Sequence, residues 1–420
     1  MHPVSCILDP GYKIQDTGKN MDTTKLSKRA QQLAPSATLG MAAKAGKLRA
    51  QGVDVISFAT GEPDFDTPSF IKDAAKQSLD RGDTKYAPSA GIPQLRQAIA
   101  AKMKRDNDLD YAPEEITVSC GAKQAIANAL LAIIDDGDDV IVPAPYWVSY
   151  PAQIKLAGGN PVIVDTTANN MKLTAEQLSN ACGDKTKAII LNSPSNPTGA
   201  VYTADELKAV AKVCREKNLI IISDEIYEHI IYDDAKHISI ANVDSSLRDN
   251  IIIVNGVSKS FSMTGWRLGW AAGPKEIIAK MNQMAGQQTT SPATFVQHAT
   301  VAALEGPMDE VNQMCAAFAE RRERICAMFN DIKGIATAKP AGTFYVFADM
   351  KAFIGKSFGD TKIPDDLSLA ELLLTEGHIA SVAGTPFGAP GFIRFSFATS
   401  IENIEEGVKR LRDVLTKLKN

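Results

Sequence analysis

The stretch IIIVNGVSKSFSMTGWRLGWAA, residues 251–272, contains two short apolar segments, 251–254 and 268–272, on either side of a polar turn. Similar apolar segments recur at residues 53–58, 116–119, 140–142, 188–191 and 219–223. Most intervals between them have the periodicity of amphipathic helices, as in residues 123–134 and 204–217. Strands that alternate with helices predict an α/β fold with a mostly parallel sheet sandwiched by helices. Ligands of such a sheet bind beyond the carboxyl ends of its strands.

The pattern changes after about residue 330. A long helix is expected over residues 309–329, strands over 343–347 and 392–397, and a charged closing helix over 401–418. This order predicts a smaller α+β domain at the end of the chain. With 420 residues, the chain is long enough for two to three domains.

Composition excludes several classes of protein. The 45 Lys and Arg against 49 Asp and Glu give a net charge of −4, so no basic field is available for nucleic acid or for a membrane surface. The six cysteines form no CxxC pair, which favours a reducing, cytoplasmic setting without disulfides. No apolar run is long enough to span a bilayer. Residues 1–20 lack the features of a signal peptide, and a disordered extension is expected there.

The turn within residues 257–270 offers a nucleophile. Lys259 follows an apolar strand directly, and a lysine at a strand exit can lose its proton and form a Schiff base with a carbonyl cofactor. Arg267, eight positions further on, can bind a phosphate through its planar fork of donors. The alternatives are a solvated surface lysine and a surface salt bridge. They are disfavoured by the neighbours Gly265, Trp266 and Trp270, which are typical of a packed position.

Two further turns carry polar residues at strand ends. Asp224 ends the strand at 219–223, and a carboxylate buried there needs a cationic or hydrogen-bonding partner, for which a ring nitrogen is suitable. Its alternative role is to cap a following helix. Asn196 lies in the turn SPSNPTG, residues 193–199, where it would be fixed at the edge of the sheet; a purely structural turn uses the same residues.

A fourth segment, SCGAKQ at residues 119–124, leads from a strand through small residues into a helix. Free N–H groups and the helix dipole at such a point can cradle a phosphate, although small residues at such a turn more often serve packing alone. Trp147 follows in the segment PYWVSYP, residues 145–151, and can stack on a planar ring or belong to the core.

Together these segments resemble the fold-type I, class I aminotransferases that depend on pyridoxal phosphate, and most closely the bacterial-type subgroup (Ib) of aspartate aminotransferases. The resemblance runs from about Leu26 to the end of the chain. It rests on six ordered blocks: GEPDF at 61–65, TKYAP at 84–88, SNPTG at 195–199, SDEIY at 223–227, Ser258-Lys259 with Arg267, and FIRFS at 392–396.

The resemblance implies a role for each residue. Lys259 would hold pyridoxal 5'-phosphate covalently and act as the general base, Asp224 would keep the ring nitrogen protonated, and Tyr227 and Asn196 would bind the phenolic oxygen. Trp147 would stack on the ring. The phosphate would be held by Arg267, Ser258, the N–H groups of Ala122 and Lys123, and Tyr86 of a neighbouring subunit, which implies a homodimer with shared active sites. Gly61 and Arg394 would bind the substrate's α-carboxylate, and Trp147 and Asn196 would also contact the substrate.

The resemblance also implies the substrates. Another subgroup of the family binds the distal carboxylate of a dicarboxylate with an arginine, but residues 286–292, GQQTTSP, contain none. In the bacterial-type subgroup the segment 35–38, with Thr38, and the lysine matching Lys123 take over this contact. Members transfer the amino group of L-aspartate to 2-oxoglutarate in a ping-pong reaction, and some also accept prephenate. Aromatic or other aminotransferases and carbon–sulfur β-lyases on the same fold are the alternatives.

The family's domain organisation divides this chain into four parts. Residues 1–25 would be a disordered extension, 26–70 the N-terminal part of the small domain, 71–329 the large domain that binds the cofactor, and 330–420 the C-terminal part of the small domain. The five histidines show no metal-binding spacing, and no metal is expected.

Overall fold

The computed structural model describes residues 26–420. The predicted extension, residues 1–25, lies outside the described residues. Helix α1 (Lys28–Gln31) belongs to a first unit that ends at Ala34, and the Ser27 side chain caps it by accepting a hydrogen bond from the Ala30 N–H at 3.1 Å. Residues 35–420 form a second unit. None of the helices between residues 26 and 420 is both long and apolar enough to cross a membrane.

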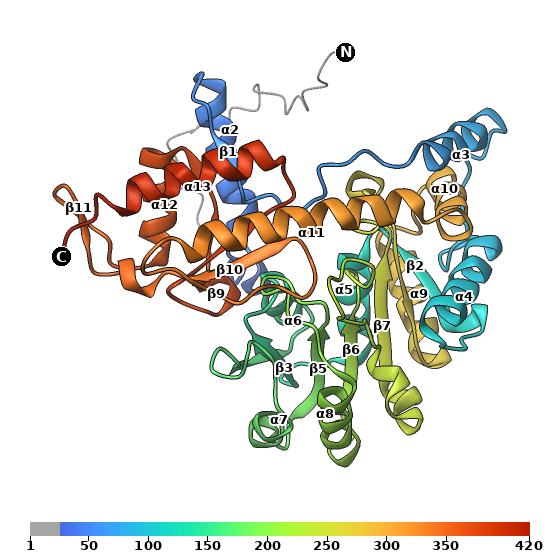
Figure 1. Ribbon diagram of the computed structural model, residues 1–420. Helices are drawn as coiled ribbons and strands as arrows, with labels where there is room; N and C mark the ends of the chain where they lie inside the picture. The colour runs from blue at the N-terminus through green and yellow to red at the C-terminus, as the bar shows by residue number, and fades with distance from the viewer. Residues whose placement is uncertain (1–25) are drawn as a thin grey trace. The chain divides into compact units, whose positions relative to one another are not determined.

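The second unit contains a sheet of seven strands (Figure 1). Neighbouring strands run parallel except β8, which is antiparallel to β2 and to β7. The predicted mostly parallel α/β sheet is therefore confirmed. In spatial order the strands are β2 (Ile116–Ser119), β8 (Gly269–Ala272), β7 (Ile251–Gly256), β6 (Ile220–Asp224), β5 (Thr186–Asn192), β3 (Asp139–Ala144) and β4 (Asn160–Asp165).

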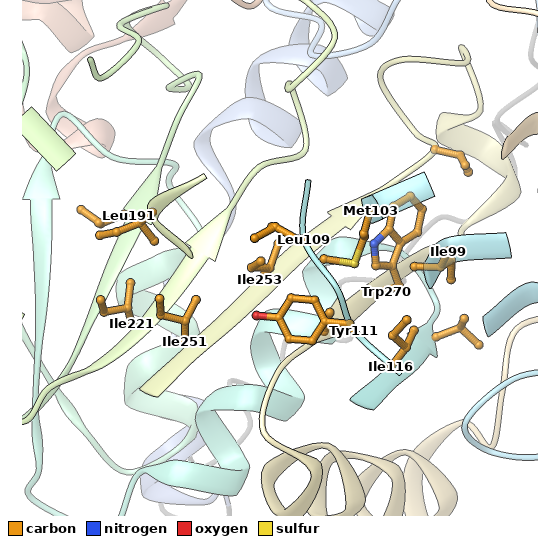
Figure 2. Packing of buried hydrophobic residues seen from close by; sticks show 14 of the residues in the cluster. Ile99, Met103, Leu109, Tyr111, Ile116, Leu191, Ile221, Ile251, Ile253 and Trp270 are labelled. Carbon is orange, nitrogen blue, oxygen red and sulfur yellow. The ribbon is translucent and has the colours of Figure 1, made fainter. Parts of the chain in front are cut away.

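Alternation along the central strands builds a core on each face of this sheet. Ile221 and Ile251 belong to one buried cluster, whereas the adjacent Ile222 and Ile252 belong to another, because successive strand side chains point to opposite faces. Figure 2 shows part of the first cluster, with Ile221 and Ile251 side by side. The helices that pack in this first cluster are α3 (Ser69–Asp80), α4 (Pro93–Asn107), α7 (Ala175–Ala181), α8 (Ala204–Glu216) and α10 (Thr294–Glu305). The helices that pack in the cluster on the opposite face are α5 (Ala122–Ile133), α6 (Tyr150–Leu156) and α9 (Lys275–Gln288).

A second, antiparallel sheet follows in the chain. Its strands are, in order, β14 (Val382–Ala383), β15 (Phe392–Ser396), β10 (Tyr345–Asp349) and β9 (Ala336–Thr337). They share a core with α11 (Asp309–Asn330), α12 (Asp366–Gly377) and α13 (Ile401–Leu415). The N-terminal part of the unit joins here, because α2 (Ala37–Ala50) contacts β13 (Ile379–Ala380) and β14, and β1 (Ile56–Ser57) pairs with β13. A short hairpin, β11 (Ser357–Phe358) and β12 (Thr361–Lys362), completes the strands. The domain borders at residues 70 and 330 stay predictions.

Several strands differ from the prediction, and the short strands β9, β11, β12, β13 and β14 lie outside all the predicted segments. The apolar segment 53–58 is a strand only at Ile56–Ser57, since pairing with β13 extends over just two residues. Strand β4 was not predicted, although residues 162–164 are apolar, because Gly158, Gly159 and Pro161 are typical of a turn and proline is tolerated in a strand mainly at a sheet edge, where β4 lies. The predicted helices over 123–134, 204–217, 309–329 and 401–418 are confirmed to within three residues as α5, α8, α11 and α13.

Candidate active site

A pocket lies beyond the carboxyl ends of β5, β6 and β7, where Asn192 and Asp224 end their strands and Lys259 follows the third. The structure brings nearly all the candidate residues into its lining; Tyr86 does not line it. Those lining the pocket are Thr38, Gly61, Ala122, Lys123, Trp147, Asn196, Asp224, Tyr227, Ser258, Lys259, Arg267 and Arg394. Residues more than 350 positions apart therefore meet at the edge that parallel-sheet topology predicts.

The amine of Lys259 is the candidate nucleophile. Its Nζ donates a hydrogen bond to the carbonyl oxygen of Gly61 and lies 6.0 Å from the ring centroids of Tyr227 and Phe344. Burial, followed by the positive charges of Arg394 and Arg267, lowers the pKa of Lys259 to about 8. An amine with this pKa is partly unprotonated near neutral pH, so it can attack a carbonyl carbon or accept a proton.

The carboxylate of Asp224 lies deep in the pocket, with 4% of the residue exposed. Its Oδ2 accepts a hydrogen bond from the Tyr150 hydroxyl at 2.6 Å, and its Oδ1 accepts one from the Ile226 N–H at 3.3 Å. The second bond stabilises a turn, not the helix cap that was the alternative. Burial raises the pKa of Asp224 to about 6. Within residues 26–420 no cation pairs with this carboxylate at ion-pair distance, so the site fits a positively charged ring nitrogen.

Arg394, on β15, is a buried cation that is 2% exposed. Its Nη1 donates to Asn196 Oδ1 and its Nη2 to the Ala59 carbonyl oxygen, each at 2.9 Å, while its buried Nε has no hydrogen-bond partner in the described chain. The guanidinium carbon lies 4.3 Å from the centroid of the Tyr345 ring, whose hydroxyl is 2.9 Å from that of Tyr227. Both acceptors of Arg394 are neutral, so a carboxylate ligand would supply the missing anion.

The first turn of α5 forms an anion site. Gly121 precedes it with a φ of +86°, no side chain caps the helix in the described chain, and a Cβ at Gly121 would lie 2.5 Å from Arg267 Nη2. Strand β8 approaches equally closely, since a Cβ at Gly269 would lie 2.3 Å from the Ala122 nitrogen. The free N–H groups, the helix dipole, Arg267 and the adjacent Ser258 hydroxyl together suit a phosphate group.

Lys123 places a further cation in the pocket, in addition to Lys259, Arg267 and Arg394. Its Nζ lies 4.9 Å from the centroid of a Trp147 ring. Burial and the charge of Arg267 lower the pKa of Lys123. Thr38, in the first turn of α2, also lines the pocket.

Some residues of the pocket were not predicted as functional. Tyr150 and Tyr345 both line it and bond to predicted site residues, and the sequence signal for them was slight because a tyrosine in an apolar segment is normally core. Tyr86 is 96% exposed and outside the pocket of its own chain, so its predicted role in a neighbouring subunit stays a prediction.

A comparison with known families agrees with this geometry. The family model described as "Aminotransferase class I and II" matches residues 53–411. The chain belongs to this family. This confirms the resemblance read from the sequence blocks, and the aminotransferase acts on amino acids and 2-oxoacids.

Curated relatives of the aminotransferase match over nearly their whole length. It is 49% identical to an aspartate aminotransferase of Bacillus sp. strain YM-2, covering 92% of this chain and 98% of the relative. It is 45% identical to an aspartate/prephenate aminotransferase of Cereibacter sphaeroides, with 92% and 98% coverage. Among solved structures, the aspartate aminotransferase of Thermus thermophilus with maleate has a TM-score of 0.88 and 43% identity, covering 93% of this chain and 99% of that one.

Aminotransferases of this family use pyridoxal phosphate, and the pocket of this aminotransferase fits that group. Lys259 offers an amine, the anion site at α5 suits a phosphate, and the buried Asp224 carboxylate lacks a cation that a protonated pyridine nitrogen provides. The pocket therefore has one partner for each reactive group of pyridoxal phosphate, which are its aldehyde, its phosphate and its pyridine nitrogen.

Proposed function

We propose that this aminotransferase transfers the amino group of L-aspartate to 2-oxoglutarate, yielding oxaloacetate and L-glutamate by a ping-pong mechanism. The observation that carries the proposal is that, beside Lys259 and Arg267, which we assign to the cofactor, the pocket holds two more cations, Arg394 and Lys123, which match a substrate with two carboxylates. The relatives named as aspartate aminotransferases support it. The relative from Cereibacter sphaeroides is named an aspartate/prephenate aminotransferase. We therefore propose that prephenate is a further amino-group acceptor of this protein.

Each candidate residue of the pocket has a separate role toward the cofactor or the substrate. When bound, pyridoxal phosphate supplies an electron sink for the carbanion that forms at the substrate's Cα. Lys259 binds the cofactor and moves the proton at Cα, and Asp224 holds the proton on the ring nitrogen. Tyr227 and Asn196 bind the phenolic oxygen. Trp147 stacks on the ring, and Arg267, Ser258 and the N–H groups of Ala122 and Lys123 hold the phosphate.

Substrate binding uses the two cations. Arg394 and Gly61 bind the α-carboxylate, and Arg394 has a free Nε and a planar fork for a two-bond contact. Thr38 and Lys123 bind the distal carboxylate. L-Aspartate and 2-oxoglutarate each carry an α-carboxylate and a distal carboxylate. The same two cations can therefore bind the substrate of either half-reaction.

The visible spectrum of the protein with pyridoxal phosphate tests the proposal. L-Aspartate added without a 2-oxoacid should abolish the yellow band, and 2-oxoglutarate should restore it. A yellow band that persists with L-aspartate contradicts the assignment and favours an aromatic aminotransferase or a carbon–sulfur β-lyase. If no yellow band forms at all, Lys259 is not the residue that binds the cofactor.

Replacing Lys123 by methionine tests the distal contact. Lys123→Met removes the charge but keeps the backbone N–H, and a hydrogen bond to a charged group contributes about 1.5–3 kcal/mol. We expect kcat/KM for L-aspartate to fall by about 10- to 150-fold. L-Alanine, which has no distal carboxylate, is the internal control. An equal loss of kcat/KM with both donors would show that Lys123 does not bind the distal carboxylate of L-aspartate.

Replacing Tyr150 by phenylalanine tests the support of Asp224. The Tyr150 hydroxyl donates to the carboxylate and so favours its charged form, which means that its loss raises the pKa of Asp224 further. We expect the acidic limb of the kcat/KM profile to move up by about one pH unit. Tyr146→Phe is the matched control, because burial alone raises the pKa of Tyr146, without a contribution from a hydrogen-bonding or charged partner in the described chain; a similar shift in both variants would argue against the role of Tyr150.

We infer that the working form is a homodimer in which Tyr86 of one subunit reaches the phosphate site of the other. Its 96% exposure leaves the side chain available for a second chain. Mixing inactive Tyr86→Ala and Lys259→Ala subunits should restore about a quarter of wild-type activity, since half the dimers would be mixed and each would hold one native site. No recovery after subunit exchange, verified by light scattering, would count against a shared site.

We also infer a cytoplasmic location. The cysteines of the described residues, Cys120, Cys182, Cys214, Cys315 and Cys326, are all free, as expected in a reducing compartment. Recovery of the activity in a membrane or secreted fraction of the source cells would contradict it.

A further inference from the structure

A buried polar cluster lies on the face of the seven-stranded sheet opposite the pocket. Ile222, two residues before Asp224, packs on the pocket side with α5, whereas Ile221 and the α4 residues pack on the other side. By the same alternation, Ser223 and Glu225 lie on the α4 side. We call Glu225, His237, Glu228 and Lys102 the rear cluster.

The first half of the rear cluster is a carboxylate with three partners. Glu225 is 2% exposed, and its Oε1 accepts hydrogen bonds from the Ser223 hydroxyl at 2.8 Å and the Ser239 hydroxyl at 2.6 Å. Its Oε2 lies 3.0 Å from Nε2 of His237, whose side chain is 7% exposed. The two hydroxyls are neutral, so among these three partners a protonated His237 is the one that can balance the charge of Glu225.

The second half of the rear cluster is balanced without His237. Glu228 forms an ion pair with Lys102 of α4, and its carboxylate accepts hydrogen bonds from Asn255 Nδ2 at 2.8 Å and Asn107 Nδ2 at 2.9 Å. Although burial opposes it, the charge of Lys102 holds the pKa of Glu228 well below its ordinary value. The proton on His237 therefore decides whether the rear cluster carries a net charge.

His237 holds that proton more firmly than an ordinary histidine. Burial disfavours its charged form, but the carboxylates of Glu225 and Glu228 outweigh burial and raise the pKa of His237, against a smaller opposing effect of Lys102. His229, 3.4 Å from Glu228, has its pKa lowered by burial.

Other charged and titratable groups adjoin the rear cluster. Asp106 lies 3.8 Å from Lys102 and 4.0 Å from His229. The ring centroid of Tyr111, whose pKa burial raises to about 12, lies 4.3 Å from the guanidinium carbon of Arg248, which pairs with Glu115 at 2.9 Å.

The rear cluster is joined to the active site through the backbone. Glu225 follows Asp224, Glu228 follows Tyr227, and Asn255 lies on β7 four residues before Lys259. The negative charge of Glu225 also adds to the effect of burial in raising the pKa of Asp224. A change of charge in the rear cluster therefore alters the electrostatic potential at Asp224, on the pocket side of the sheet.

We propose that Glu225 and His237 are positioning residues for the aminotransferase, a charge pair behind the sheet that sets the electrostatic environment of Asp224 and Lys259. The proposal rests on the proposed function, in which those two residues bind pyridoxal phosphate. Neither member of the pair lines the pocket, so the pair acts through its neighbours.

The pH midpoint of the visible band of the holoenzyme tests this, because it reports the proton on the Lys259 nitrogen. Glu225→Gln removes a negative charge and should lower the midpoint; His237→Gln removes a positive charge and should raise it. We expect shifts of about half a pH unit in opposite directions, with the double variant close to wild type. Ser239→Ala, which removes a hydrogen bond to Glu225 without changing charge, should leave the midpoint unchanged.

A structural role alone gives a different pattern. Shifts of the same sign in both single variants, no shift in either, or a shift in Ser239→Ala equal to that in Glu225→Gln would each overturn the proposal. Thermal unfolding of every variant separates a loss of folding from a change of charge.

Histidine NMR of the full-length protein supplies a readout that needs no activity. The chain has five histidines, so the His237 resonance is identified by its loss in His237→Gln. We expect His237 to titrate above the ordinary value of about 6.5 and to fall toward it in Glu225→Gln. An ordinary titration that Glu225→Gln does not change would overturn the charge pair. A wild-type holoprotein without a visible band would overturn the proposed role of Lys259 and the positioning effect together, while the NMR titration would still reveal the pair.

Discussion

Replacing Lys259 by alanine is expected to lower kcat/KM for L-aspartate by about 10⁴-fold or more, the largest effect of any single substitution in the pocket. The amine donates to the carbonyl oxygen of Gly61 and lies 6.0 Å from the centroid of the Tyr227 ring. Its lowered pKa of about 8, caused first by burial, lets it give up and regain a proton near neutral pH. Alanine can neither bind the cofactor covalently nor move the proton at Cα. Single-turnover reaction with L-aspartate measures the loss.

The same variant separates chemistry from folding. Small primary amines added to Lys259→Ala should restore part of the rate, because they supply a base to the space that the side chain leaves. Lys280→Ala, at an exposed position of α9, is the matched control and should retain wild-type activity. If Lys259→Ala kept more than a tenth of the wild-type rate without added amine, the residue would not be the proton carrier.

Residues at strand ends were predictable from the sequence. Lys259 and Asp224 each follow a short segment rich in isoleucine and valine, which favours a buried strand, and parallel topology brings the ends of such strands to one edge. Arg394 lies within a strand of the second sheet, and nothing in its local pattern indicates a ligand site; the resemblance to the family supplied it. The same is true of Thr38 and Gly61, which reach the pocket from the N-terminal segment.

Other contacts depend on tertiary packing and leave no local signal. Tyr150 and Asp224 are 74 positions apart, and a tyrosine among apolar residues indicates core as readily as a hydrogen bond. His237 was one of five scattered histidines without metal spacing, and its partner Glu225 became visible only once residues 223–239 were placed in space. Strand β4 was missed for a different reason, since Gly158, Gly159 and Pro161 indicate a turn, and proline is tolerated in a strand mainly at the edge of a sheet.

Replacing Arg394 by lysine is expected to lower kcat/KM for L-aspartate by about 10²- to 10³-fold, although the charge is kept. Truncating one partner of a buried, hydrogen-bonded charge pair costs about 2–5 kcal/mol. The guanidinium spans Asn196 Oδ1 and the Ala59 carbonyl with two nitrogens and still presents a third, Nε, without a partner in the described chain. An ammonium has no planar fork and cannot keep both bonds while it binds a carboxylate.

The loss in Arg394→Lys should fall on every amino acid alike, because the α-carboxylate is common to all of them. L-Aspartate and L-alanine should therefore lose the same factor, which distinguishes this arginine from Lys123, where only the acidic donor is affected. Maleate, with two carboxylates and no amine, gives the binding step alone, and its Kd should rise by a comparable factor. A loss confined to L-aspartate would exchange the roles of the two cations and place the distal carboxylate at Arg394. Arg410→Lys, at a surface ion pair with Asp54, controls for the substitution itself and should change neither constant.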